Sequence, residues 1–260
     1  MNAALRPGDP ETDFGVPIPG QVLPRDQWAH TAIKRLPPTG PLDWQAIFGR
    51  EAPIVLELGC GNGRFTLLSA LSRPGVDHCA IDFLPLVVRY ATRRANQRGL
   101  SNVRFAVKDA QTFMSAYVAP GSVAEVHLYH PQPYADPRLA HRRLVRPQFL
   151  AQVHRSLAPG GLFVAQTDNP EYWAYMLKVI PSFFAFQEQP GPWPDAPEGR
   201  SRREILARSR GLRIYRGVGT RTGDLTPAEL RNRIGMLPAP TFRTRGPSCE
   251  LDAFEAANPH

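Results

Sequence analysis

Residues 54–63 read Ile-Val-Leu-Glu-Leu-Gly-Cys-Gly-Asn-Gly, an apolar run that ends in alternating glycines. The apolar run has the length and composition of a buried strand. Glycines at its end let the backbone turn tightly and approach a ligand closely. A helix is expected to begin at about Arg64, so that its N-terminal amides face the same place. The stretch therefore predicts a strand–turn–helix unit that binds a ligand at the turn.

Strand-like and helix-like runs alternate along the middle of the chain. This alternation is typical of a parallel sheet with helices on both faces, so the sequence predicts an α/β fold, Rossmann-like and doubly wound. Two later runs are expected to add a C-terminal antiparallel hairpin to this mostly parallel sheet. The expected strands are Ile54–Leu58, His78–Ile81, Val103–Val107, Val123–Tyr129 and Leu162–Gln166, the helices are Phe65–Ser72, Leu84–Arg98, Ala110–Tyr117 and Arg146–Leu157, and the hairpin joins Phe183–Gln189 to Leu212–Val218.

Proline density divides the chain into three parts. Residues 1–45 are too rich in proline for regular helix or sheet, so a flexible N-terminal leader is expected there. Residues 46–222 hold the periodic segments and form the predicted domain. Residues 223–260 are expected to contain one helix at Thr226–Leu237, with Thr226 as its cap, followed by a tail. A turn is also expected at Pro159-Gly160-Gly161.

The net charge is +8, and arginine supplies almost all of the positive charge, because lysine occurs only at Lys34, Lys108 and Lys178. Arginine binds phosphates as a planar fork and stacks on bases, which suits a nucleic-acid partner. A genome that favours arginine codons would give the same bias, so composition alone leaves both explanations open.

The cysteines bear on the compartment and on metals. Cys60, Cys79 and Cys249 are odd in number and lack metal-ligand spacing. No signal peptide or membrane-spanning run is recognisable in the sequence. These features predict a reduced, soluble, cytoplasmic protein with neither a metal nor a membrane as partner. A monomer or a weak homodimer is expected.

Three acidic residues lie at or near the ends of consecutive predicted strands. Glu57 stands two residues before Gly59, Asp82 ends the second strand, and Asp109 follows the third. In a doubly wound sheet these ends meet in one crevice, where Asp82 can accept both hydroxyls of a ribose and Asp109 can contact an adenine amino group. An isolated aspartate more often caps a helix, and that alternative stays open for Asp109.

The spacing of the glycines separates two cofactors. Nicotinamide dinucleotides are bound by G-x-G-x-x-G, whereas this chain reads G-x-G-x-G and places Arg64 at the last position of that fingerprint. Glu57 is suited to the amino group of a methionine moiety. The combination resembles the class I methyltransferases, which implies S-adenosylmethionine as cofactor, with Glu57, Gly59, Gly61, Asp82 and Asp109 among its binding residues.

Residues 126–144 narrow the resemblance to one family. They read Val-His-Leu-Tyr-His-Pro-Gln-Pro-Tyr-Ala-Asp-Pro-Arg-Leu-Ala-His-Arg-Arg-Leu. This is similar to the tRNA (guanine-N7)-methyltransferases, whose fourth strand leads into Phe-Pro-Asp-Pro-Trp, a lysine and a basic cluster. Residues 167–172 match the Thr-Asp-x-x-x-Tyr segment of that family, and residues 201–204, which begin with Ser201, resemble its Thr-x-x-Glu segment. The similarity covers roughly residues 50–222 and implies methyl transfer to N7 of a guanine in tRNA.

The family pattern also implies roles for individual residues, with two departures. Gln132 takes the place of an aspartate implied in catalysis and cofactor contact, and Asp136 replaces a lysine that binds substrate. A glutamine accepts and donates hydrogen bonds but lacks the charge that strengthens them. Gln132 is thus the expected catalytic residue and also a cofactor-binding residue, and the expected substrate-binding residues are Asp136, Arg142, Arg143, Asp168, Ser201 and Glu204.

Neighbouring histidines, aromatic residues and basic residues allow more than one interpretation. His127 is expected to be a satisfied core residue, whereas for His130 a core role and a functional role are about equally supported. Tyr172, Trp173 and Tyr175 are expected either to stack on unpaired bases or to pack in the core. Two basic clusters predict either an electrostatic track for tRNA phosphates or a solvated face. The first comprises Arg138, His141, Arg142, Arg143 and Arg146, and the second comprises Arg200, Arg202, Arg203, Arg208 and Arg210.

Two further functions therefore stand beside tRNA guanine methylation. One is an S-adenosylmethionine-dependent enzyme that acts on another RNA or on a small molecule. The other is an RNA-binding relative without catalytic activity, motivated by the departures at Gln132 and Asp136. Binding of S-adenosylmethionine separates the third reading from the other two.

Overall fold

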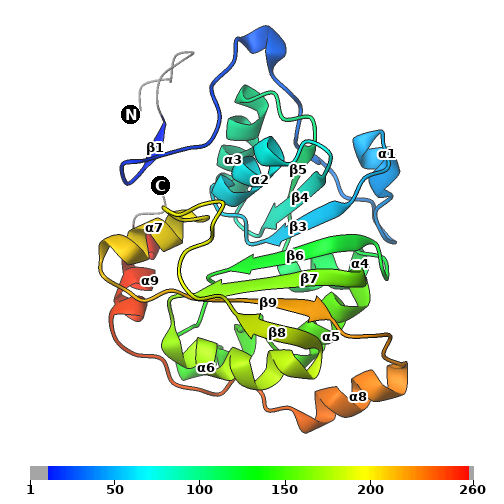
Figure 1. The fold of residues 1–260 in the computed structure, drawn as a ribbon, viewed down its shortest axis with the longest axis vertical. Coiled ribbons are helices and arrows are strands. Elements are labelled where there is room, and N and C mark those ends of the chain that lie inside the picture. The colour runs from blue at the N-terminus through cyan, green and yellow to red at the C-terminus, as the bar shows by residue number, and fades with distance from the viewer. Residues whose placement is uncertain (1–10, 258–260) are drawn as a thin grey trace. The chain divides into compact units, whose positions relative to one another are not determined.

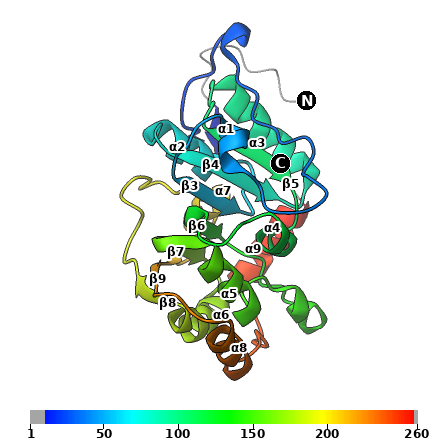
Figure 2. The ribbon, with the colours of Figure 1, turned by 90° about the vertical axis from the view of Figure 1, so that its right-hand side faces the viewer.

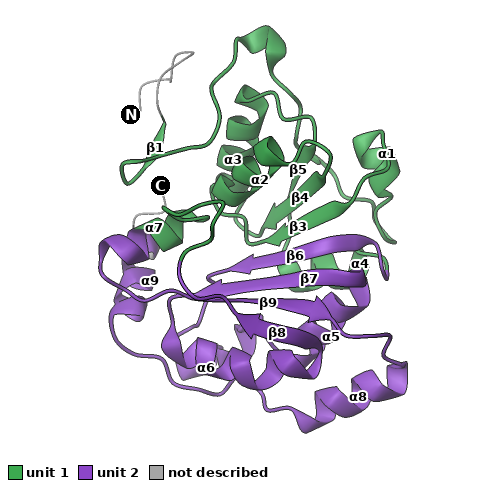
Figure 3. Ribbon diagram, viewed as in Figure 1, with its two compact units in different colours: residues 1–119, 192–205 green, residues 120–191, 206–260 purple. Residues whose placement is uncertain are grey.

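The structure is a computed structural model that describes residues 11–257. Two compact units are present (Figure 3). Unit 1 lies within residues 1–119 and 192–205, and unit 2 lies within residues 120–191 and 206–260. Each unit has its own set of strands and covering helices (Figure 1).

Unit 1 is built on three parallel strands, β3 (Ile54–Leu58), β4 (Asp77–Asp82) and β5 (Val103–Val107), in the order β5-β4-β3. Helices α2 (Arg64–Ser72) and α3 (Pro85–Gln97) lie side by side (Figure 1), and α3 contacts both β4 and β5. Every residue of β3 and β4 is buried, which explains why the apolar residues 54–56 and 79–81 are consecutive rather than alternating. Two shorter helices, α1 (Trp44–Phe48) and α4 (Ala110–Ala116), complete this part of the unit.

The N-terminal segment of unit 1 follows the surface of α3 and β5. Residues 11–33 include the two-stranded β1 (Thr12–Asp13) and β2 (Val16–Pro17) and the short helix η1 (Arg25–Gln27). Backbone bonds join Leu23 to Gln97 and Ala29 to Asn96, and Ala32 pairs in parallel with Phe105 of β5. The flexible leader was predicted over residues 1–45. Residues 11–33 are held by these contacts, and residues 1–10 lie outside the described residues.

Unit 2 contains β6 (Val123–Tyr129), β7 (Leu157–Thr167), β9 (Tyr215–Arg221) and β8 (Phe184–Glu188), in the order β6-β7-β9-β8. The pair β6–β7 is parallel, whereas β9 is antiparallel to both β7 and β8. The helices are α5 (Pro147–Ser156), α6 (Pro170–Val179), α8 (Pro227–Met236) and α9 (Pro247–Ala257), together with the 3-10 helices η2 (Pro137–Arg142) and η3 (Ile180–Ser182). Both α5 and α6 contact β7, and α8 lies against α5 (Figure 2). Helix α7 (Arg202–Ser209) has residues in both units.

The predicted α/β fold with mostly parallel strands and a C-terminal antiparallel hairpin is confirmed. Thr226 caps α8 as predicted, through a reciprocal capping box with Glu229. The turn predicted at Pro159-Gly160-Gly161 is instead an irregular step inside β7, where the register to β6 shifts between Val123 and Glu125. Gly161 is required there, because a Cβ would lie 2.9 Å from two carbonyl oxygens.

The tail predicted after residue 237 is wrong for residues 247–257, which form α9. Leu251 of α9 is fully buried against Leu206 and Ala207 of α7. Among residues 11–257, no helix combines the length and the apolar character needed to cross a bilayer.

Leu251→Ala is expected to lower the free energy of unfolding by about 2–5 kcal/mol, because it removes a buried side chain and leaves a cavity. Urea denaturation measures this change. The matched control is Met236→Ala, since Met236 is 76% exposed, and it should change stability by less than about 0.5 kcal/mol. Equal, small effects of both variants would show that α9 does not pack on α7.

Candidate active site

Residues 59–63, named here the glycine loop, join β3 to α2 in unit 1. Gly59, Gly61 and Gly63 all have positive φ, at 78°, 50° and 81°. A Cβ on Gly59 or Gly61 would meet open space, whereas a Cβ on Gly63 would lie 2.8 Å from Ala91 of α3. The first two glycines therefore leave the backbone accessible to a ligand, and the third allows close packing of loop and helix.

Two buried carboxylates stand beside the glycine loop, Glu57 on β3 and Asp82 at the end of β4. Asp82 accepts the Gly61 amide at 3.1 Å and the Leu84 amide at 3.0 Å. The Thr66 hydroxyl donates to Glu57 Oε2. Burial raises the pKa of Glu57 to about 8, against the Thr66 bond, and the charge of Asp82 raises it further. Burial also raises the pKa of Asp82, and the backbone amides that donate to its carboxylate lower it in part. The charge of Asp82 therefore acts on Glu57 across this turn.

Asp109 lies at the end of the neighbouring strand, in the same unit. It is exposed, and its Oδ1 accepts the Thr112 amide at 2.8 Å, so that it is the N-cap of α4. Asp109 therefore caps a helix in this structure, which is the alternative that the sequence analysis left open. Parallel pairing sets Asp82 opposite Val107 and places these two strand ends side by side.

One apolar group at these strand ends was missed by the sequence analysis. Phe83 is 64% exposed directly after Asp82, and Leu84, Leu86 and Val107 are exposed nearby in the chain or on β5. Large apolar side chains of this kind suit the face of an aromatic ligand. The signal available in the sequence was an aromatic residue directly after the strand-end acid.

In unit 2, residues 130–134, named here the strand-end loop, follow β6. His130 and Tyr134 bracket it with positive φ values of 49° and 45°, which are rare for residues other than glycine. Such backbone persists only where the surroundings hold it. Gln132 lies exposed between the buried Pro131 and Pro133.

Arg143, which was predicted to bind substrate, contacts the strand-end loop through its guanidinium group. It is fully buried, and its guanidinium donates to the carbonyl oxygens of Pro133 and Tyr134 at 2.6 and 2.9 Å. It also donates to Pro240 and Phe242 and lies 3.8 Å from the Phe242 ring centroid. The prediction for Arg143 is thereby corrected, because its donors hold backbone carbonyls. The neighbouring Arg142 is exposed.

Asp168, also predicted to bind substrate, belongs to a buried hydrogen-bonded chain. Its Oδ1 lies 2.7 Å from His130 Nδ1, and its Oδ2 accepts the hydroxyl of Ser248 on α9 at 2.9 Å. The Gln166 amide nitrogen lies 2.8 Å from His130 Nε2. An amide nitrogen donates, so these contacts assign the imidazole proton to Nδ1, facing Asp168. The structure therefore gives His130 a part in ordering the strand-end loop.

The remaining predicted substrate residues have local partners. Asp136 caps η2 and pairs with Arg138 at 2.7 Å, and this hydrogen bond lowers the pKa of Asp136. Ser201 and Glu204 belong to unit 1, where the Ser201 hydroxyl accepts the Glu204 amide and the buried Glu204 carboxylate accepts the Arg200 amide.

The aromatic and histidine alternatives are decided by burial. Tyr172, Trp173 and Tyr175 are buried, and their polar atoms bond to Val145, Glu188 and Pro238, so they pack in the core. His127 is buried between Tyr129 and Glu125, as expected of a satisfied core residue. In the described part of the chain, no three His, Cys, Asp or Glu side chains come together in a way that could hold a metal.

Comparison of the sequence with known proteins shows which family the chain belongs to. Residues 51–215 match a family model described as "Putative methyltransferase". A tRNA (guanine-N(7)-)-methyltransferase from Bordetella pertussis is 35% identical over 178 residues, which are 68% of this chain and 69% of that protein. One from Alkalilimnicola ehrlichii is 34% identical over 186 residues, covering 72% of this chain and 78% of the relative. This chain belongs to the tRNA (guanine-N(7)-)-methyltransferase family.

Solved structures show the fold of the class. The crystal structure of the 16S rRNA methyltransferase KamB has a TM-score of 0.56 at 14% identity and covers 75% of this chain and 99% of that one. The chain thus has the Rossmann-like fold of class I methyltransferases, and S-adenosylmethionine is its cofactor. The open backbone at Gly59 and Gly61 and the buried acids beside it fit that cofactor.

The raised pKa of Glu57 has a consequence for stability. A carboxyl whose pKa is higher in the folded than in the unfolded chain stabilises the fold below about pH 4.5, and this stabilisation is lost as the pH rises to about 8. A difference of one pH unit between the two pKa values corresponds to about 1.4 kcal/mol in the free energy of unfolding. Glu57→Gln should therefore make the ligand-free protein more stable than wild type at pH 8.5. At pH 5 this gain in stability should be smaller. Thermal unfolding at both pH values measures this, and a pH-independent difference would contradict the assignment.

Proposed function

We propose that the protein transfers the methyl group of S-adenosylmethionine to N7 of a guanine in tRNA. The observations that carry the proposal are the identity of about 35% to tRNA (guanine-N(7)-)-methyltransferases over 178 residues and the family match over residues 51–215, which includes both the glycine loop and the strand-end loop. The variable-loop guanine is the site that the family resemblance implies.

Within unit 1, we assign cofactor binding to Glu57, Gly59, Gly61, Asp82 and Asp109. The Gly59 and Gly61 backbone lies against the cofactor, and Asp82 accepts the ribose hydroxyls alongside its bond to Gly61. Glu57 receives the amino group of the methionine moiety. Burial holds the pKa of Glu57 near 8 in the ligand-free protein, so its carboxyl is largely protonated there. The positive charge of the bound amino group favours the ionised carboxylate, so binding lowers this pKa and releases the proton. Asp109 is assigned to the adenine amino group.

Bound S-adenosylmethionine supplies a methyl group on a positively charged sulfur. Guanine N7 already carries an exposed lone pair, so no side chain has to remove a proton to create the nucleophile. The protein's task is to orient the base, and orientation alone can supply several kcal/mol. Gln132, exposed on a rigidly held loop, is the proposed catalytic residue, since its amide can hydrogen-bond the base as positive charge develops there. Tyr134 is assigned to stacking on it.

For substrate binding we retain Asp136, Arg142, Asp168, Ser201 and Glu204. Arg142 is the most direct candidate for phosphate contact because it is exposed beside the strand-end loop. Asp168 and Glu204 act on substrate through the loops they order, since both carboxylates are buried in hydrogen bonds. Affinity for tRNA should fall as salt concentration rises.

The catalytic part is proposed to be residues 46–222, because the family match spans residues 51–215. Residues 1–45 and 223–260 are the proposed extensions. The proposed partner is tRNA and the proposed compartment is the cytoplasm. Neither a metal nor a second subunit enters the proposed chemistry, and a monomer or weak homodimer stays a prediction.

Purified protein with S-adenosylmethionine is expected to form 7-methylguanosine in unmodified tRNA, detected by mass spectrometry of the nucleosides. Cells that lack the gene should lose that nucleoside. Methylation of a different nucleoside would show another RNA activity. Cofactor binding with no transfer to any RNA would contradict the proposal.

Gln132→Ala should lower kcat about tenfold, because one hydrogen bond to the base is lost. Gln132→Asp should turn over at least as fast as wild type, since a charged acceptor makes the stronger bond. The control is Gln187→Ala on β8, also exposed in unit 2, which should leave the rate unchanged. An unchanged rate in Gln132→Ala would remove Gln132 from the catalytic machinery.

A further inference from the structure

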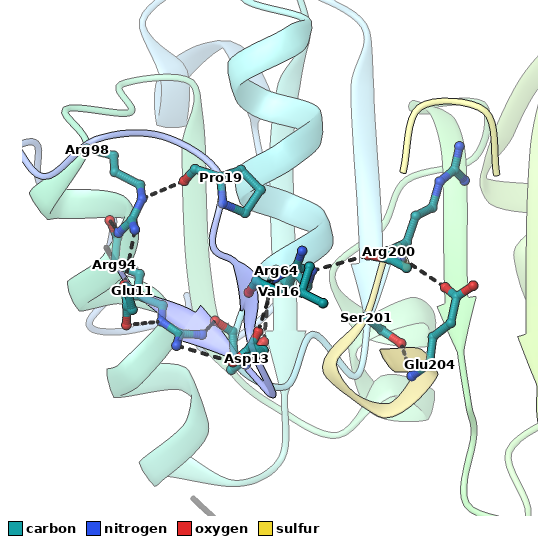
Figure 4. A network of polar contacts seen from close by, with 12 residues as sticks. Glu11, Asp13, Val16, Pro19, Arg64, Arg94, Arg98, Arg200, Ser201 and Glu204 are labelled. Atoms are coloured by element: carbon teal, nitrogen blue, oxygen red, sulfur yellow. Dashed lines mark hydrogen bonds and ion pairs between the residues drawn. The ribbon is translucent and has the colours of Figure 1, made fainter. Parts of the chain in front are cut away.

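A buried charge network in unit 1 joins the N-terminal segment to α2 and α3 (Figure 4). Two acids of that segment, Glu11 and Asp13, form ion pairs with Arg64 of α2, with Arg94 of α3 and with Arg98, which directly follows α3. No side chain in these ion pairs is more than 9% exposed. Removing one partner of such a buried pair leaves an uncompensated charge, so each acid matters to the arrangement.

The two acids hold different parts of unit 1. Glu11 pairs with Arg94 at 2.7 Å and with Arg98 at 3.0 Å, so it ties the segment to α3. Asp13 accepts both of its closest hydrogen bonds from the Asn62 amide nitrogen, at 3.0 and 3.1 Å. Asn62 stands between Gly61 and Gly63, within the glycine loop. Asp13 therefore binds the cofactor loop, and Glu11 binds the helix beside it.

Hydrogen bonds of this network hold both the side chain and the backbone carbonyl of Asn62. Its carbonyl oxygen accepts Arg94 Nη1 at 3.3 Å, and its side-chain oxygen accepts the Arg64 amide at 3.3 Å. Arg94 and Arg64 each lie 3.5 Å from Asp13. One carboxylate thus fixes both the side chain of Asn62 and the arginines that hold its backbone and the start of α2.

The network also reaches the segment that contains Ser201 and Glu204 (Figure 4). Arg64 Nε donates to the Gly199 carbonyl at 3.1 Å, and the next residue, Arg200, donates its amide to Glu204. The Arg200 guanidinium lies 4.1 Å from the Trp193 ring centroid. Arg64 therefore joins the N-terminal segment, the glycine loop and the 199–204 segment.

We infer that Asp13 is a positioning residue for S-adenosylmethionine, which makes the N-terminal segment part of the cofactor site. A loop of three glycines at positive φ has many conformations to lose on binding, and a side chain that fixes it beforehand lowers that cost. Asp13 does this through Asn62, without contact to the cofactor. The inference rests on the proposed function for the identity of the ligand.

The test compares two isosteric variants of the full chain, Asp13→Asn and Glu11→Gln. Both remove one buried negative charge from the same network, and only the first disturbs the bonds to Asn62. Calorimetric titration gives the Kd for S-adenosylmethionine, and thermal unfolding gives Tm. We expect both variants to lower Tm and Asp13→Asn alone to raise Kd, roughly tenfold. A Kd for Asp13→Asn within about twofold of wild type, or an equal rise in Glu11→Gln, would overturn the inference.

Two further measurements keep the test decisive. Asn62→Ala leaves Asp13 its arginines and removes only the loop's side chain, so it should raise Kd as Asp13→Asn does, even where that variant folds poorly. Hydrogen exchange of the Gly61 and Gly63 amides in ligand-free protein should be faster in Asp13→Asn than in Glu11→Gln. Equal exchange would contradict the inference, whether or not the protein binds the cofactor. Failure of wild type to bind S-adenosylmethionine would count against the proposed function instead.

Discussion

The bond from the Gly61 amide to the buried carboxylate of Asp82 is the contact on which the proposed chemistry depends. It fastens the glycine loop to the end of β4 and fixes an acid beside an open stretch of backbone. Such an acid is costly to bury, and the raised pKa values of Asp82 and Glu57 reflect that cost. Carboxylates with strongly raised pKa values that cluster at one turn are typical of functional sites.

Much of the fold followed from the sequence because its strands carry unambiguous patterns. Ile54–Leu58 and Val103–Val107 are apolar runs bounded by turn residues, and their bounds in the structure match the predicted ones. Helix α9 could not be found in this way, since its only fully buried described side chain is Leu251 and its apolar partners lie on α7, far away in the chain. The early start of β7 was hidden by Pro159-Gly160-Gly161, which reads as a turn unless the irregular pairing with β6 is known.

The candidate site was only partly readable from the sequence. Glu57 and Asp82 were named from their places at strand ends, and parallel pairing puts them beside one glycine loop. Arg143 was misassigned because a basic cluster looks the same in sequence whether its side chains face solvent or carbonyl oxygens. The roles of Asp13 and Ser248 were invisible for a different reason. Asp13 acts on Asn62, 49 positions away in the chain, and Ser248 acts on Asp168, 80 positions away, and no local sequence pattern records such contacts.

A crystal structure of the protein with S-adenosylhomocysteine, the demethylated product of the cofactor, tests the central claim most directly. The account predicts the ribose hydroxyls within hydrogen-bond distance of Asp82, the amino group beside Glu57 and the backbone of Gly59 and Gly61 against the ligand. A ligand bound elsewhere, or a glycine loop and an Asp82 carboxylate that touch no part of it, would contradict the account.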